Sequence, residues 1–218
     1  MHRFACLLTA SAVAGLSATH AAALQIDDFG LTFSATNSGT IDDADILGGE
    51  LDYNLLGNSL VEAGGNATLL GLTAANSTTV FLTYDGNDDS VGPALDLNAD
   101  LTDGGTSDRF VFDVTAVTGS VQVGVDLFRS DFDSGGDRRA ARTITVDQPG
   151  LIEITFASLS VTSDLDSILT DLGRLGLTIS SLDQGDSITL NNLATVPEPA
   201  SLALLGLGGL CLTRRRRA

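Results

Sequence analysis

Three loops of this sequence gather carboxylate and amide oxygens, the atoms that bind hard cations such as calcium. They contain Asp42, Asp43 and Asp45; Asp85, Asn87, Asp88 and Asp89; and Asp131, Asp133 and Asp137. None follows the twelve-residue spacing of an EF-hand loop with its closing glutamate. The third loop runs directly into Arg138, Arg139 and Arg142, so we interpret it as a solvated turn with ion pairs. The first two loops are candidate calcium sites.

Most catalytic chemistry needs residues that the central part of the chain lacks. His2, His20, Cys6 and Cys211 all lie near the ends, and the sequence contains no lysine and no tryptophan. Residues 24–196 therefore cannot form a histidine-activated nucleophile, a cysteine nucleophile, a lysine Schiff base or a typical zinc site. Two carboxylates would still suffice for a glycoside hydrolase, which is the most distant alternative. We expect no enzyme.

Sugar binding usually relies on flat aromatic faces, and Tyr53 and Tyr84 are the only large polar aromatic residues. They are the candidate glycan contacts. The alternative is that both rings belong to the core or to the edge of a sheet.

The central region is strongly acidic. Residues 24–196 carry 27 acidic residues against six arginines, a net charge of −21. Such a field repels nucleic acids and anionic lipids and favours solubility or cation binding. The apolar fraction of the sequence is high enough for a folded core, and 173 residues correspond to one domain.

Short runs of alternating apolar and polar residues, separated by Gly, Asp, Asn and Ser, must position these groups. In residues 109–115, Phe110, Phe112 and Val114 point one way, and in residues 120–128 the inner positions are Val121, Val123, Val125 and Leu127. About ten strands are predicted: 30–34, 50–56, 67–72, 78–84, 109–115, 120–128, 141–146, 151–156, 175–180 and 187–193.

One helix is predicted at residues 164–172, capped by Ser163, because leucine and isoleucine recur there at helical spacing. The fold class that follows is all-β: an antiparallel two-sheet sandwich or jelly roll with at most one short helix. A C-terminal hydrophobic helix is added outside the sandwich.

The first 23 residues have the organisation of a signal peptide. His2 and Arg3 precede an apolar stretch over residues 4–16, and Ala21, Ala22 and Ala23 supply small residues for cleavage by signal peptidase. We expect cleavage after Ala23, which makes residues 24–196 the acidic β-sandwich domain.

The last 22 residues, 197–218, have three parts. Pro197, Glu198 and Pro199 form an extended segment, residues 202–212 an apolar run, and Arg214, Arg215, Arg216 and Arg217 a basic end. Prolines keep the first part out of a helix, and arginines favour a cytoplasmic position at the end of a short transmembrane helix.

This order resembles the PEP-CTERM sorting signal, a family in which an exosortase of Gram-negative, exopolysaccharide-producing bacteria recognises the tail. The resemblance implies that Pro197, Glu198 and Pro199 are the sorting motif and that the four arginines are stop-transfer charges. It also implies anchoring in the inner membrane until processing, and then the cell surface or extracellular matrix. A plain tail anchor without processing is the alternative.

Residues 40–50 and the closing strand at 188–193 also resemble jelly-roll, galactose-binding-like carbohydrate-binding modules. Such modules often hold a structural calcium between these two regions, commonly through an acidic residue of the closing strand. Here Asn191 or Asn192 stands at that place. The sequence thus predicts an exported surface or extracellular-matrix protein with a structural or adhesive role. A carbohydrate-binding module associated with exopolysaccharide is the alternative.

Overall fold

Alternating side chains build the strands as the sequence predicts. In β8 (Ser107–Thr118), Phe110, Phe112 and Val114 are buried, and in β9 (Val121–Arg129) all four predicted inner residues are buried. The computed structural model describes residues 23–29, 33–35, 38–56, 59–63, 68–72, 79–86, 94–131, 138–181, 183 and 185–197. Among these residues there are fourteen strands, and every strand pairing is antiparallel.

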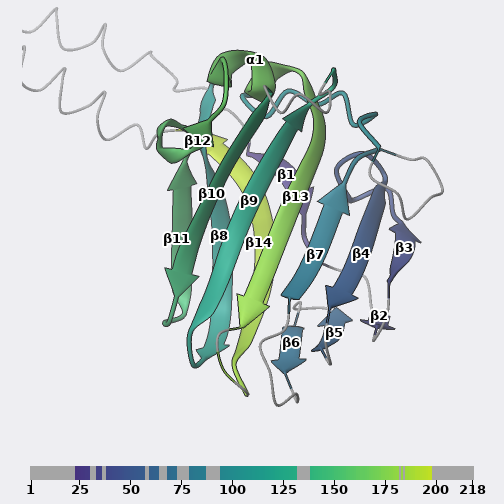
Figure 1. Ribbon diagram of the computed structural model, residues 1–218, viewed down its shortest axis with the longest axis vertical. Helices are drawn as coiled ribbons and strands as arrows, with labels where there is room; N and C mark the ends of the chain where they lie inside the picture. The colour runs from purple at the N-terminus through teal and green to yellow at the C-terminus, as the bar shows by residue number, and fades with distance from the viewer. Residues whose placement is uncertain are drawn as a thin grey trace, which may run out of the picture.

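The strands form two main sheets, and Figure 1 looks onto the larger one. In order, its seven strands are β12 (Ser160–Val161), β10 (Arg139–Val146), β9, β13 (Leu172–Ser181), β7 (Thr79–Tyr84), β4 (Glu50–Leu56) and β3 (Gly39–Asp42). The four strands behind are β1 (Leu24–Asp27), β14 (Ser187–Pro197), β8 and β11 (Gly150–Thr155). A small third sheet contains β2 (Phe33–Ala35), β5 (Ser59–Ala63) and β6 (Thr68–Leu72).

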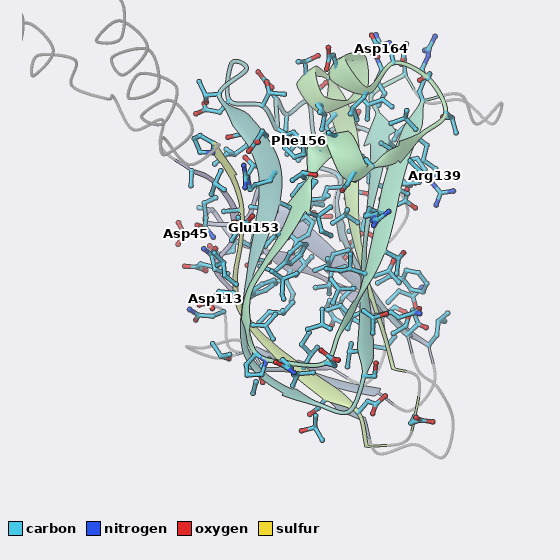
Figure 2. All side chains as sticks on the ribbon, turned by 90° about the vertical axis from the view of Figure 1, so that its left-hand side faces the viewer. Asp45, Asp113, Arg139, Glu153, Phe156 and Asp164 are labelled. Atoms are coloured by element: carbon cyan, nitrogen blue, oxygen red, sulfur yellow. The ribbon has the colours of Figure 1, made fainter. Side chains whose placement is uncertain are left out.

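The core lies between the two main sheets. Figure 2 shows the sandwich from its side, with Glu153 and Asp113 on one sheet, Arg139 on the other, and side chains filling the space between. Phe110 of β8 packs edge to face against Phe156, with ring centroids 5.2 Å apart. Burial of this apolar surface is the main force that holds the sheets together. The predicted all-β sandwich is confirmed.

The predicted helix is present but shorter. A 3₁₀ turn covers Phe156–Ser158, and α1 spans Leu165–Thr170 with Asp164, not Ser163, as its N-cap. The prediction of Ser163 was wrong, and the helix ends early because Leu172 already pairs with Arg129 in the large sheet. Within the part of the chain that the structure describes, no helix is long and apolar enough to cross a membrane. The predicted helix at 202–212 lies outside that part.

Candidate functional site

The outer face of the seven-stranded sheet divides into an uncharged half and a charged half. Because successive side chains alternate between faces, residues that neighbour the buried positions of each strand point outward. Two adjacent rows across β10, β9, β13, β7 and β4 contain no charged residue, and we call them the uncharged patch. Its members are Thr143, Gly124, Thr178, Phe81 and Asn54 in one row, and Thr145, Gln122, Ser180, Thr79 and Leu56 in the other.

The uncharged patch combines apolar surface with hydroxyl and amide groups. Phe81 is 36% exposed and Leu56 is 52% exposed, so the patch presents apolar surface to the solvent. Around them, the hydroxyls of Thr79 and Ser180 lie 3.1 Å apart, and Ser38 donates to Asn54 Oδ1 at 3.0 Å. The arrangement offers an apolar platform with hydrogen-bonding groups on all sides.

Gly124 leaves the floor of the patch low at its centre. A Cβ atom at this position would lie 3.0 Å from Thr143 Oγ1, so a larger residue would need Thr143 to move. Glycine inside a strand weakens it, and it commonly marks a place where a ligand or another backbone approaches closely.

The charged half begins with a row that holds Asp126 of β9 and Asp52 of β4, and the next row contains Arg139, Phe128 and Arg174 on β10, β9 and β13. The two guanidinium carbons lie 5.5 and 3.9 Å from the Phe128 ring centroid, within cation–π range. The Arg139 guanidinium also donates one hydrogen bond to each carboxylate oxygen of Asp126, both at 2.6 Å, and these bonds raise the pKa of Arg139. Burial lowers the pKa of the Arg174 guanidinium.

Three buried carboxylates lie beside this row. Glu50 and Asp52 of β4 and Asp85, directly after β7, offer oxygen atoms that all lie within 4.8 Å of one another. Asp52 accepts from the Thr40 hydroxyl at 3.0 Å, and Asp85 accepts from the Ala94 N–H at 2.7 Å. Buried carboxylates so close together favour a cation beside them, and Asp85 already interacts electrostatically with the Arg174 guanidinium. Among the described residues, this acidic cluster is the grouping that could hold a calcium ion.

The acidic cluster differs from the predicted calcium sites. Only Asp85 was a candidate, and Asn87, Asp88 and Asp89 lie outside the described residues. Glu50 and Asp52 were missed, although their spacing of two residues in a strand predicts that both point to the same face.

The first predicted site, Asp42, Asp43 and Asp45, lies elsewhere. Asp43 accepts the Asp45 N–H at 3.0 Å, and its own N–H donates to the Gly49 carbonyl, so it shapes a tight loop. Asp45 and Asp28 line a cavity of about 560 Å³ beside this loop. Nothing in this geometry brings Asp42, Asp43 and Asp45 together around one point.

The third acidic loop contains the expected ion pairs where it is described. Asp131 pairs with Arg138, and with Arg129 at 3.3 Å. Arg139 instead binds Asp126, while Asp133 and Asp137 lie outside the described residues.

Tyr84 cannot serve as a glycan platform in this fold. Its side chain is 0% exposed, and its hydroxyl donates to Asp27 Oδ2 at 2.9 Å across the sandwich. Tyr53 is half-buried on the core side of β4 and its ring lies over Gly39. The exposed aromatic ring of this region is Phe81, which the sequence reasoning overlooked.

Burial of the Asp27 carboxyl makes stability depend on pH. Burial raises the pKa of Asp27 to about 6, and the negative charges of Asp28 and Asp43 contribute in the same direction. Hydrogen bonds from the Phe29 N–H and the Tyr84 hydroxyl lower this pKa and offset part of the rise. The folded protein therefore holds this proton more tightly than the unfolded chain. The resulting stabilisation is fully present below about pH 4 and is lost as the pH rises through about 6.

We expect the Asp27 contribution to fall by on the order of 2–3 kcal/mol between pH 4 and pH 7. Denaturant unfolding at both pH values, compared between the unaltered protein and Asp27→Asn, isolates this contribution from that of the other carboxylates. The asparagine variant should lose less stability over this range. Equal losses in the two proteins would contradict the assignment.

The last strand carries the chain directly into the predicted sorting motif. Pro197 is the final residue of β14 and pairs with Ser107 of β8, while Thr195 lies opposite Leu24 of β1. The first and last strands that the structure describes, β1 and β14, thus lie side by side in the four-stranded sheet. Glu198, Pro199 and Arg214 to Arg217 lie outside the described residues.

Comparison with known protein families finds a match at the C-terminal end of the chain. Residues 195–217 match the model of the PEP-CTERM protein-sorting motif, as the sequence predicted. No curated protein matches the chain in sequence.

Similar solved structures include the solution structure of CtCBM11, with 16% identity and a TM-score of 0.44, covering 84% of this chain and 99% of that one. A family 11 carbohydrate-binding module of a cellulosomal cellulase of Clostridium thermocellum has 13% identity and a TM-score of 0.39, covering 81% and 95%. An exo-β-agarase has 12% identity and a TM-score of 0.44, covering 81% and 25%. The chain carries a PEP-CTERM sorting motif at residues 195–217, and this motif implies an exported protein.

Proposed function

We propose that the protein is an adhesive component of the cell surface or extracellular matrix that binds a polysaccharide through the uncharged patch. The observation that carries this proposal is the patch itself. Ten outward positions on five adjacent strands hold no charge, although residues 24–196 have a net charge of −21. A field of this strength repels anionic polymers, so a neutral polymer fits best.

The chemistry of the patch suits a sugar chain. A sugar ring has apolar C–H surface that packs on an aromatic or aliphatic side chain, and hydroxyls that exchange hydrogen bonds with Thr, Ser, Asn and Gln. Phe81 and Leu56 supply the apolar surface, and the remaining side chains supply the polar groups. Binding, rather than catalysis, is the role that we assign.

The dimensions of the patch favour a chain over a single sugar. Neighbouring strands lie about 4.8 Å apart, so five strands span about 19 Å. A polysaccharide lying across the strands would present several units to equivalent rows of side chains. This geometry supports an adhesive role, in which many weak contacts along a polymer act together.

Phe81→Ala is the direct test of this proposal. Loss of the exposed ring should weaken retention on a neutral insoluble polysaccharide, such as cellulose, agarose or the exopolysaccharide of the host, by about tenfold or more. Leu151→Ala is the matched control, because Leu151 is 62% exposed on β11 of the other sheet. Retention is measured by co-sedimentation of the mature protein with each polysaccharide.

The two variants distinguish binding through the uncharged patch from nonspecific adsorption through exposed apolar side chains. A fall in retention for Phe81→Ala alone supports the uncharged patch. Equal retention of both variants, or no retention of the unaltered protein on any of the polysaccharides, would contradict the proposed binding and leave a purely structural role.

A further inference from the structure

The sorting motif overlaps the last strand of the sandwich. The match begins at Thr195, whereas β14 continues to Pro197. Thr195 is 0% exposed and lies between Leu24 of β1 and Phe110 of β8. The first three residues of the matched segment, including Pro197 of the Pro-Glu-Pro motif, are therefore part of the folded sheet, and Val196 and Pro197 pair with β8 alone.

A strand held on both sides is a poor substrate for a processing enzyme. Enzymes that cut peptide bonds bind their substrate as an extended segment whose backbone groups are available for pairing. In the order β1-β14-β8-β11, β14 is an inner strand, and both of its edges are occupied at Thr195. An enzyme cannot take up this segment until the end of β14 separates from its neighbours.

The segment that links β14 to the apolar run is short. Only residues 198–201 lie between the end of β14 and the apolar run that begins at Leu202. Five extended steps from Pro197 to Leu202 span at most about 17–18 Å. When the tail is inserted in a membrane, the folded end of the sandwich therefore stands close to the surface where the motif must be recognised.

The end of β14 is built so that it can open. Its register with β8 shifts between Val196 and Pro197, and β1 pairs through only Leu24, Gln25 and Asp27, with a shift between the last two. The Thr195 hydroxyl is buried, and its Oγ1 has no hydrogen-bond partner among the described residues. Ends with interrupted pairing are the parts of a fold that open at low free energy.

We propose that closure of the β14 end between β1 and β8 controls removal of the sorting tail. The folded sandwich holds Thr195, Val196 and Pro197 in the sheet, and the processing enzyme binds the motif when this end is open. This inference rests on the proposed processing of the tail and adds that the rate of processing is set by local opening of the fold.

An insertion that frees the motif tests this control. Eight residues of alternating Gly and Ser, placed between Val196 and Pro197 in the full chain, keep the Pro-Glu-Pro sequence but move it out of the sheet. Tail removal, followed by pulse–chase labelling in the native host, should become roughly tenfold faster, the factor that corresponds to about 1.4 kcal/mol of opening. The same insertion between Pro149 and Gly150, in the open turn that faces Val114 at the other end of β8, is the control and should leave the rate unchanged.

A disulfide between β1 and β14 holds the end of β14 closed, and so has the opposite effect to the insertion. Facing Cα atoms in antiparallel strands are about 4.5–5.5 Å apart, within the range that a disulfide bridges. Leu24→Cys with Thr195→Cys, in a background where Cys6 and Cys211 are serine, should slow tail removal when oxidised and restore it after reduction.

The outcomes distinguish this inference from the proposal on which it rests. If the tail is removed from the unaltered protein and neither variant changes the rate, control by strand closure is wrong. The proposed processing would still stand. A tail that is never removed overturns the proposed processing, and this inference with it. A faster rate for the insertion and a slower rate for the oxidised cross-link support the inference.

Discussion

Calcium at millimolar concentration is expected to raise the thermal unfolding midpoint of the protein by about 5–10 °C. The reason is the acidic cluster of Glu50, Asp52 and Asp85, whose oxygen atoms lie within 4.8 Å of one another in the interior. A ligand at one hundred times its dissociation constant stabilises by about 2.7 kcal/mol, and a domain of this size gains about 2–4 °C per kcal/mol. Melting in calcium and in chelator, followed by circular dichroism, measures the shift.

Matched variants tie the shift to the cluster. Asp52→Asn and Asp85→Asn should each remove most of the calcium response. Neither should lower the midpoint in chelator much, because each also relieves repulsion between carboxylates. Asp45→Asn, in the loop that the sequence first suggested, should keep the full response. An unaltered protein whose midpoint is the same in calcium and in chelator would retire the site.

Replacing Glu198 and Pro199 by alanine is expected to abolish removal of the tail almost completely. These two residues complete the Pro-Glu-Pro motif, which lies within the matched segment 195–217, and neither belongs to β14. Pro197 is left in place because it ends that strand. The variant should therefore fold normally yet stay in the membrane fraction, whereas the unaltered protein should lose its tail and leave that fraction.

Immunoblotting of membrane, surface and medium fractions from the native host measures this outcome. A variant in which Arg214 to Arg217 are all lysine is the control, because it keeps the positive charge and should be processed normally. Normal processing of the alanine variant would contradict recognition through the motif.

The sequence predicted most of the sandwich because period-two alternation reflects local geometry. The inner positions of β8 and β9 were identified correctly, and the bounds of β4, Glu50–Leu56, were correct. Four strands were missed: β1, β3, β5 and β12, each of five residues or fewer. A run that short carries too few alternations to stand out, and its strand forms only because a neighbour is already in place.

The site was harder to predict because it depends on which strands become neighbours. Asp85 meets Glu50 and Asp52 only because β7 pairs with β4, a register that the alternation within either strand does not contain. The same register places Phe81 beside Asn54 on the outer face and turns Tyr84 into the core. Residue type favoured the tyrosines as glycan contacts, whereas position in the sheet favours Phe81.

The end of the last strand shows a similar limit. Proline is rare inside a sheet, so the sequence predicts that Pro197 begins an exposed linker. In the structure it occupies the final position of β14, after a register shift, where the missing N–H interrupts no further pairing along the strand. The sandwich and the sorting signal therefore share residues that the sequence assigned to separate parts.

Mass spectrometry of the mature protein from its native host shows directly whether both terminal segments are removed during export. An exported sandwich sorted by its tail should begin at Leu24, retain β14 through Pro197 and lack the apolar run at 202–212 together with the four arginines. A mature protein at its final location that still ends at Ala218 would contradict the account.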